Sequence, residues 1–220
     1  MGDDLERRAA GFAAMGDPIR LGIVDELVLS DRSPSELRAR LGIESNLLAH
    51  HLDVLSDAGL VVRNRSSGDG RRRYVHLRPE VVARLRIGGR APAGGALFIC
   101  TRNSARSQLA ASLWRALTGR PASSAGTHPA EAVHPGAVQA ATRAGLDLGD
   151  AVPRVLAPGG DTAALVVTVC DRAHEEIGED GWLHWSIPDP VPDGGTEAFD
   201  AVVTELRARI RAITDDSQAA

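Results

Sequence analysis

The stretch Cys100-Thr-Arg-Asn-Ser-Ala-Arg106-Ser107 decides the fold of the second half of this 220-residue chain. An apolar run over 96–99 precedes it, and a helix-favouring segment over 108–117 follows it. The predicted order is therefore strand, tight loop and helix, with Cys100 where the strand becomes the loop. In such a loop, successive backbone N–H groups and the positive end of the helix point at one spot, and Arg106 adds a planar fork suited to two oxygens. The pattern predicts a site for a tetrahedral oxyanion.

The same positive field favours a thiolate over a thiol, so Cys100 is predicted to be a nucleophile. The alternative is a buried cysteine at the end of a strand, close to a surface arginine. The strand before Cys100 and the helix after it favour the nucleophile.

Length and composition favour two small cytoplasmic domains. The two cysteines are far apart in sequence and form no disulfide framework, which is typical of a reducing compartment. No apolar run has membrane-spanning length, and the first residues lack the order of a signal peptide, so no membrane partner is expected. Residues 1–90 carry 15 arginines against 13 acidic residues, whereas residues 91–220 carry 10 against 16. The first half is therefore the better candidate for nucleic-acid binding.

The two domains are expected to meet at a glycine- and proline-rich stretch, Ile87-Gly-Gly-Arg-Ala-Pro-Ala-Gly-Gly95, which has no apolar periodicity. The predicted boundaries are a first domain over 1–87, a linker over 88–95, a second domain over 96–213 and a frayed tail over 214–220.

The first half reads as short helices followed by a hairpin. Helices are predicted over 5–15, 18–29, 34–41 and 45–58 from N-cap, capping-box and glycine signals at their ends. The last two, joined at Gly42-Ile43, form a helix-turn-helix. Strands over 60–65 and 71–77 then form the hairpin called a wing.

The segment Ser45-Asn-Leu-Leu-Ala-His-His-Leu-Asp-Val-Leu-Ser-Asp-Ala-Gly-Leu-Val61, with the arginine-rich hairpin after it, resembles winged-helix repressors of the ArsR type over about residues 8–80. This resemblance implies a double-stranded DNA operator and a homodimer formed through the winged-helix domain. Leu48, Leu52 and Leu55 share one helix face and should pack inward. The residues expected to face DNA are Ser45, Asn46, Ala49 and His50 in the helix, and Arg63, Arg65, Arg71, Arg72 and Arg73 in the wing.

Two other interpretations of these residues are open. The arginine hairpin could be an ordinary solvated surface, and His50-His51 could be a metal pair, but DNA contact is favoured over both, and no metal site is predicted. The first half contains no cysteine, so it cannot sense a soft metalloid through thiolates as arsenite-responsive repressors do. Any signal should come from the second half.

The second half alternates strands and helices. Further strands are predicted over 123–127, 163–169 and 183–186, with helices over 135–144 and 196–213. Apolar strands between helices indicate a parallel sheet covered on both faces, with the reactive loop at the carboxyl end of a strand. The predicted fold class is a mainly α winged helix-turn-helix followed by an α/β domain with a four-stranded parallel sheet.

Three motifs resemble the low-molecular-weight tyrosine phosphatase fold, and more closely its arsenate reductase branch: the Cys100–Ser107 loop, Val167-Thr-Val-Cys-Asp-Arg172 and His184-Trp-Ser-Ile-Pro-Asp-Pro190. The resemblance implies that Cys100 attacks the substrate and that Ser107 hydrogen-bonds its sulfur. Asp189 would be the general acid, although by itself it could be a turn residue before proline. The residues implied in oxyanion binding are Thr101, Arg102, Asn103, Ser104, Ala105 and Arg106.

Two positions favour a reductase over a phosphatase. Phosphatases of this fold usually place an aromatic ring after the Asp-Pro pair, where this chain has Val191. Cys170 matches the cysteine that, in the reductases, attacks the cysteine–arsenic adduct, although a plain buried cysteine is the alternative reading.

The chain departs from the reductase pattern at two positions. Thioredoxin-coupled members carry a third cysteine about one turn further on, where this chain has Ile177. Arg102 is a second departure, because glycine is usual there.

The predicted function is reduction of arsenate to arsenite, fused to transcriptional regulation of an arsenic response. No bound cofactor is expected. The reductant would be external: either a mycothiol-like small thiol resolves the Cys100 adduct, or a thioredoxin- or glutaredoxin-type protein reduces a Cys100–Cys170 disulfide. The alternatives are a non-catalytic regulator that responds to an oxyanion or to oxidation, and a low-molecular-weight protein phosphatase with a DNA-targeting module.

Overall fold

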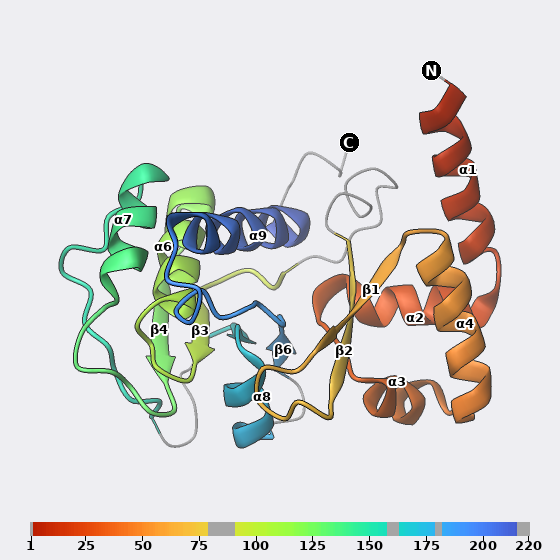
Figure 1. The fold of residues 1–220 in the computed structure, drawn as a ribbon, viewed down its shortest axis with the longest axis horizontal. Helices are drawn as coiled ribbons and strands as arrows, with labels where there is room; N and C mark the ends of the chain where they lie inside the picture. The colour runs from red at the N-terminus through yellow and green to blue at the C-terminus, as the bar shows by residue number, and fades with distance from the viewer. Residues whose placement is uncertain (1, 79–90, 158–162, 179–181, 215–220) are drawn as a thin grey trace. The chain divides into compact units, whose positions relative to one another are not determined.

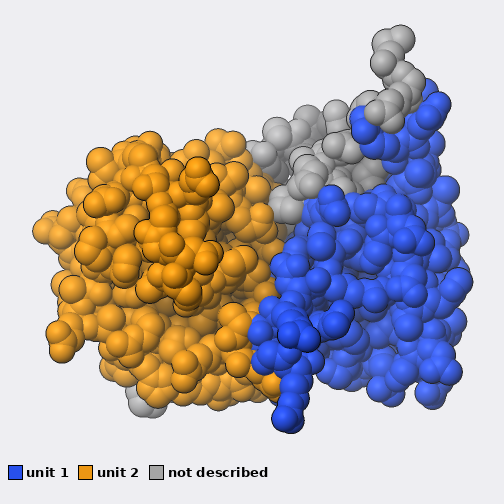
Figure 2. Space-filling view, in the orientation of Figure 1, with its two compact units in different colours: residues 1–66, 70–90, 215–220 blue, residues 67–69, 91–214 orange. Residues whose placement is uncertain are grey.

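The computed structural model describes residues 2–78, 91–157, 163–178 and 182–214 (Figure 1). These residues divide into two compact units, coloured separately in Figure 2. The described part of the first unit covers residues 2–66 and 70–78, and that of the second covers 67–69 and 91–214 with the gaps just given.

The first unit is helical at its start and ends in a hairpin. Its elements are α1 (Gly2–Met15), α2 (Pro18–Leu29), α3 (Pro34–Leu41), α4 (Ser45–Asp57), β1 (Val61–Arg65) and β2 (Arg73–Leu77). Asp17 caps α2 by accepting hydrogen bonds from the amides of Ile19 and Arg20 at 2.9 and 3.1 Å. Ser33 and Glu36 form the capping box that opens α3. These caps satisfy amides that a helix start leaves without partners, which is why the sequence predicted both starts.

Helices α3 and α4 form the predicted helix-turn-helix. The turn passes through Gly42 at φ 64°, a left-handed conformation that side chains with a Cβ rarely adopt. In α4, Leu48, Leu52 and Leu55 are buried as predicted. The core of the unit therefore fixes which face of α4 remains outside.

The hairpin is antiparallel, with Val61 opposite Leu77 and Arg65 opposite Arg73. Arg32 adds a bridge to its second strand: the amides of Arg32 and Val75 donate to each other's carbonyls at 3.1 and 2.8 Å. This bridge ties the hairpin to the residues before α3.

The second unit is built on a parallel sheet of β3 (Ala96–Cys100), β4 (Ala122–Gly126), β5 (Leu165–Thr168) and β6 (Leu183–His184), in the order β4-β3-β5-β6. Ile99 pairs with Ala125 on one side and with Thr168 on the other. All five residues of β3 are buried, as expected for the central strand of a sheet covered by helices.

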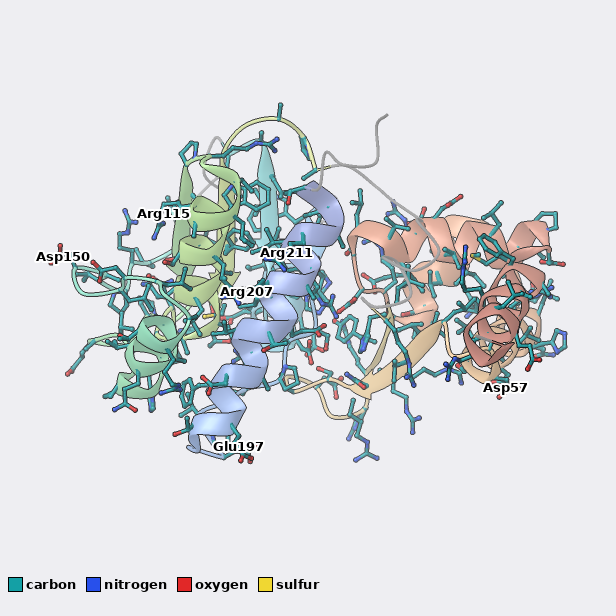
Figure 3. All side chains as sticks on the ribbon, turned by 90° about the horizontal axis from the view of Figure 1, so that it is seen from above. Asp57, Arg115, Asp150, Glu197, Arg207 and Arg211 are labelled. Carbon is teal, nitrogen blue, oxygen red and sulfur yellow. The ribbon has the colours of Figure 1, made fainter. Side chains whose placement is uncertain are left out.

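The helices of this unit are α6 (Arg106–Thr118), α7 (Pro135–Arg143), α8 (Asp171–Ile177) and α9 (Thr196–Thr214). Helices α6 and α9 lie side by side, and Figure 3 shows α9 running from Glu197 past Arg207 to Arg211. Trp114 of α6 and Trp185 both pack on Phe98 of β3, with ring centroids 5.9 and 6.0 Å away. These aromatic contacts fix α6, and with it the loop that precedes it, on the sheet.

Several elements differ from the sequence-based expectations; among them, β2 begins at Arg73 rather than at residue 71. Helix α8 was not predicted, because it is only seven residues long and its N-cap is a cysteine, which is not a usual cap. Strand β5 spans four residues rather than seven, and the sixth strand ends at His184 instead of Ser186.

The predicted linker and tail are only partly described. Residues 88–90 and 215–220 lie outside the described residues. Ala91 and Gly95 hydrogen-bond to Ile213 and Leu165 of the second unit at 2.8 and 3.2 Å. Among the described helices, none combines the length and apolarity needed to cross a membrane.

Candidate active site

Cys100 ends β3, the strand at which the order of successive strands in the sheet reverses. From β3 the chain passes to β4 on one side and later to β5 on the other, so the ends of these strands leave a crevice above Cys100. In open parallel sheets such a topological switch point is where ligands bind.

The loop after Cys100 turns its carbonyl groups outward. Every carbonyl from Cys100 to Ala105 accepts a hydrogen bond from a group surrounding the loop. The donors are, in order, the amides of Thr127, His128 and Ala130, the side chain of Gln108, and the amides of His134 and Leu109, at 3.3, 2.8, 2.9, 3.1, 2.8 and 2.9 Å. Outward carbonyls leave the amides on the inner side, and within the described chain no acceptor lies against the N–H of Arg102, Ser104, Ala105 or Arg106. The loop is therefore a preformed set of donors for an anion.

Asn103 fixes the direction of the hydrogen bonds inside the loop. Its backbone has φ 47°, a left-handed conformation that asparagine tolerates better than most residues. The amide of Arg154 can only donate, so the side-chain atom 2.8 Å from it is the acceptor Oδ1. Nδ2 therefore donates to Ser107 Oγ at 2.8 Å. The Ser107 hydroxyl proton is then available for Cys100 Sγ, 3.1 Å away.

The sulfur of Cys100 accepts a second hydrogen bond, from the amide of Asn103 at 3.1 Å. Two donors directed at one sulfur stabilise a negative charge on it more than a neutral thiol. The predicted contact between Ser107 and the sulfur is thus present in the structure.

Arg106 and Asp189 form an ion pair at the edge of the same site. Arg106 is buried; its Nη1 donates to the Ile187 carbonyl at 3.0 Å, and its Nη2 pairs with Asp189 Oδ2 at 2.9 Å. The Asp189 side chain is 39% exposed, and its Oδ1 accepts from the amide of Val191 at 3.2 Å. Asp189 is therefore both accessible to solvent and held against the loop, as a group that exchanges protons with a substrate must be.

These residues border a pocket of about 370 Å³. One wall is contributed by the segment between β4 and α7. The lining residues are Cys100, Arg102, Ser104, Ala105, Arg106, Ala130, Ala132, Val133, His134, Pro135, Asp189 and Val191. Apart from the loop, Asp189 and His134, the wall is made of small aliphatic side chains, so the pocket combines a charged floor with apolar sides.

Cys170 lies behind the loop, at the N-cap of α8. Its sulfur accepts hydrogen bonds from the amide of Thr101 at 3.2 Å and from that of Ala173 at 3.4 Å, and lies 3.3 Å from the Thr101 hydroxyl. The residue is fully buried, and this burial raises the pKa of the Cys170 thiol. Cys170 does not line the pocket described above.

A buried polar cluster supports the strand end before Cys170. His184 contacts the Thr168 hydroxyl through Nδ1 at 2.9 Å and Asp171 Oδ1 through Nε2 at 3.2 Å, and its ring stacks on His174 at 4.1 Å between centroids. Burial raises the pKa of Asp171, but the hydrogen bond from His184 and other hydrogen bonds outweigh it and hold this pKa below its usual range.

The predicted DNA-facing residues of the first unit all lie on its surface. Ser45, Asn46, Ala49 and His50 are exposed on α4, while His51 is buried. The predicted wing residues Arg63, Arg65, Arg71, Arg72 and Arg73 are exposed as well. Arg63 pairs with Asp53 of α4 at 2.6 Å, which links wing and helix.

Several supporting residues were not found by sequence reasoning. Gln108 and the Arg154 amide hold Asn103, and the amides of 127–134 hold the loop carbonyls. At Gly126 an added Cβ would lie 2.8 Å from the Thr101 carbonyl and 2.9 Å from Asn103 Cβ, so glycine is required there. Gly126 could have been noticed as a glycine ending a strand, but main-chain donors leave no residue pattern.

A cysteine at the end of a central parallel strand, an amide-lined loop and an arginine at the start of the next helix define a site for phosphate-like oxyanions. The family model described as low molecular weight phosphotyrosine protein phosphatase matches residues 96–219, and the chain belongs to this family. A helix-turn-helix domain model matches residues 15–64. No curated protein matches the chain.

Solved structures resemble the second half of the chain. A YwlE mutant from Bacillus subtilis is 20% identical, with a TM-score of 0.47 over 55% of this chain and 95% of its own. An arsenate reductase in the phosphate binding state is 22% identical, with a TM-score of 0.47 over 54% and 94%. A thioredoxin-dependent arsenate reductase from Corynebacterium glutamicum is 25% identical, with a TM-score of 0.43 over 60% and 65%.

Proposed function

We propose that this protein reduces arsenate to arsenite at Cys100 and that its helix-turn-helix unit regulates transcription in response to arsenic. Arsenate and phosphate share charge and shape, so the amide-lined loop suits both. The choice between reduction and phosphate-ester hydrolysis rests on the rest of the pocket.

The observation that carries the proposal is the character of the pocket wall. Among the described residues that border the pocket, none is Phe, Tyr or Trp. The imidazole of His134, which does border it, stacks on Phe199 at 5.1 Å and accepts from the Gly136 amide, so this ring is held by the fold. An aryl phosphate would find no ring to stack on. A small inorganic oxyanion needs none, because the loop and Arg106 provide its binding groups.

In the proposed first step the thiolate of Cys100 attacks arsenic and forms a sulfur–arsenic bond. The loop amides and Arg106 bind the remaining oxygens, and Asp189 supplies the proton with which the departing oxygen leaves as water. Ser107 and the Asn103 amide stabilise the sulfur charge before the attack. Arsenic stays in the +5 state in this step.

In the second step a thiol takes the sulfur and leaves the electron pair of the sulfur–arsenic bond on arsenic, which departs as arsenite. The proposal allows two sources for that thiol. An external small thiol could attack Cys100, or Cys170 could attack it and leave a disulfide for a redoxin.

The regulatory half of the proposal rests on the helix-turn-helix match and on the exposed residues of α4 and the wing. Arg65 and Arg73 lie directly opposite each other in the hairpin, a pairing of like charges that is unfavourable without an anion nearby. A phosphate backbone would supply such anions. We propose binding to a two-fold DNA operator as a homodimer.

The deciding experiment is arsenite production from arsenate by the purified, reduced protein, with glutathione, mycothiol and thioredoxin systems as donors and Cys100→Ser as control. Turnover that depends on Cys100 supports the reductase. A folded, reduced protein that binds arsenate but produces no arsenite with any donor would contradict it and leave a non-catalytic oxyanion-responsive regulator. Efficient hydrolysis of p-nitrophenyl phosphate without arsenite production would identify a phosphatase.

A further inference from the structure

Cys170 is the only cysteine besides Cys100 in the sequence, and its contacts suggest a different task from thiol exchange. Its sulfur is the acceptor for the first amide of the reactive loop, that of Thr101, and for an amide of the first turn of α8. Thus one atom holds two segments together at the base of the site: the loop that follows β3 and the helix that follows β5.

We propose that Cys170 is a positioning residue for the loop, and that the reducing thiol is a small molecule that enters the Cys100 pocket and attacks Cys100 directly. This inference rests on the proposed arsenate reduction, whose second step it specifies.

The two thiols differ in access to the pocket. Both side chains are buried, but Cys100 borders the pocket of about 370 Å³, whereas Cys170 is absent from its lining. A thiol that shares the pocket with the arsenic adduct reaches Cys100 Sγ along the apolar wall of Ala130, Ala132 and Val133. The Cys170 sulfur is instead held by hydrogen bonds from the amides of Thr101 and Ala173.

The protonation of Cys170 also disfavours it as the attacking thiol. A thiol attacks as its thiolate, and the burial that raises the pKa of Cys170 keeps this group protonated at neutral pH. The donors around its sulfur do not overcome this burial. A small thiol in solution is not buried, so burial does not raise its pKa.

The disulfide that Cys170 would leave is also hard for a redoxin to reach. A Cys100–Cys170 bond would form at a buried sulfur, and the sequence holds no third cysteine to carry the oxidation to the surface. The last residue of α8, seven positions after Cys170, is Ile177. A redoxin would have to expose the base of the loop to reduce that bond.

The electron balance of the proposed route needs two small thiols. The first thiolate forms a disulfide with Cys100 while the sulfur–arsenic bond breaks and its electron pair stays on arsenic, which changes from +5 to +3. The second thiol attacks this mixed disulfide, releases the thiolate of Cys100 and leaves as the oxidised small disulfide. One arsenate and two thiols thus yield arsenite, one disulfide and water.

Replacement of Cys170 by serine and by alanine separates the two roles. A serine oxygen can accept from Thr101 and cap α8 but cannot form a disulfide. Both variants and the wild type would be assayed for arsenite production with glutathione and mycothiol, for production with thioredoxin and its reductase, and for the dissociation constant of inorganic phosphate by titration calorimetry. Thermal unfolding of each variant shows that it is folded.

We expect Cys170→Ser to keep arsenite production with a small thiol and phosphate affinity within about threefold of wild type, because it retains an acceptor. We expect Cys170→Ala to bind phosphate about tenfold more weakly and to slow turnover, because the buried Thr101 amide loses its acceptor. Mass spectrometry of the Cys170→Ser protein stopped during turnover should show the small thiol on Cys100.

Loss of arsenite production in both variants, with phosphate affinity unchanged in both, would overturn the inference and make Cys170 the resolving thiol. Turnover of the wild type with thioredoxin alone would overturn the small-thiol route. If the wild type made no arsenite with any donor, the proposed function itself would fall, while the phosphate affinities of the two variants would still decide whether Cys170 positions the loop.

Discussion

Asn103 determines which groups donate and which accept in the hydrogen bonds of the loop, because its side-chain oxygen must accept and its side-chain nitrogen must donate. Its Oδ1 faces an obligate donor, the Arg154 amide, and its Nδ2 faces Ser107. The serine proton therefore points at sulfur. One side chain thus links a main-chain amide about fifty positions away in sequence to the nucleophile.

Asn103→Ala should lower the free energy of unfolding by about 1–3 kcal/mol and weaken phosphate binding, because buried donors lose their acceptor and a Cβ residue other than Asn remains at positive φ. Asn103→Gly is the matched control, since it removes the same hydrogen bonds but tolerates φ 47°. Chemical denaturation and phosphate titration measure both effects. Equal stability of the two variants would show that backbone strain contributes nothing.

The two cysteines should differ in alkylation and in their effect on stability against pH. At neutral pH iodoacetamide should modify Cys100 of the native protein and spare Cys170, as peptide mass spectrometry can show. The raised pKa means that folded Cys170 keeps a proton that the unfolded chain releases. Its contribution to stability is therefore full below the ordinary thiol pKa of about 8.5 and declines as pH rises through it.

Comparison with Cys170→Ser isolates this pH effect, because serine does not titrate in the same range. Between pH 7 and pH 10 the wild type should lose more free energy of unfolding than the variant. Equal losses, or modification of native Cys170 as fast as Cys100, would contradict the environment that the structure assigns to this thiol.

At the scale of elements, the loop depends on two neighbours that the sequence did not reveal. The strand, loop and helix around Cys100 were predicted because apolar periodicity and an arginine at the helix start leave clear patterns. The segment 127–134 supports the loop with main-chain amides, and such donors are present in every residue except proline. Helix α8 was missed for a related reason. Its N-cap is a cysteine, and the sulfur of this cysteine contacts Thr101, a residue distant in sequence.

Gly126→Ala should disturb the junction between β4 and the loop. The new Cβ would meet the Thr101 carbonyl and Asn103, which belong to the rigid loop. We expect a loss of about 1–3 kcal/mol in the free energy of unfolding, typical of an overpacked site, together with weaker phosphate binding.

Gly195→Ala is the control for this change, because the same added methyl would have only the Asp193 carbonyl nearby, at 3.9 Å. Denaturant unfolding and phosphate titration should leave Gly195→Ala close to wild type. If Gly126→Ala bound phosphate as the wild type does, the close packing at Gly126 would not be needed for the oxyanion site.

At the scale of the whole molecule, sequence reasoning separated a helix-turn-helix from a phosphatase-fold half, and both matches agree with that division. Each half carries its own core, so the patterns of helix caps and apolar strands could be read independently. The identity of the DNA contacts could not be fixed in this way. Exposed arginines occur both on ordinary solvated surfaces and on phosphate-binding surfaces. Only a complex with DNA distinguishes these two kinds of surface.

Arg73→Ala should weaken DNA binding uniformly across sequences and reduce the slope of log affinity against log salt by about 1, as expected for the loss of one phosphate contact. Arg73 is exposed and faces Arg65 across the hairpin. Fluorescence anisotropy with labelled operator-length duplexes at several salt concentrations measures the slope. Arg115→Ala, on α6 of the other unit (Figure 3), is the control and should leave the slope unchanged.

The support of the loop by main-chain groups has a consequence for how such a protein can change over generations. The amides of Thr127, His128, Ala130 and His134 hold the loop, while the side chains of Ala130, Ala132 and Val133 line the pocket. Mutation can therefore replace these side chains, and so admit a different substrate or a different thiol, without removing the main-chain hydrogen bonds that hold the loop. Selection for a new substrate and selection to preserve the chemistry would act on separate atoms of the same segment.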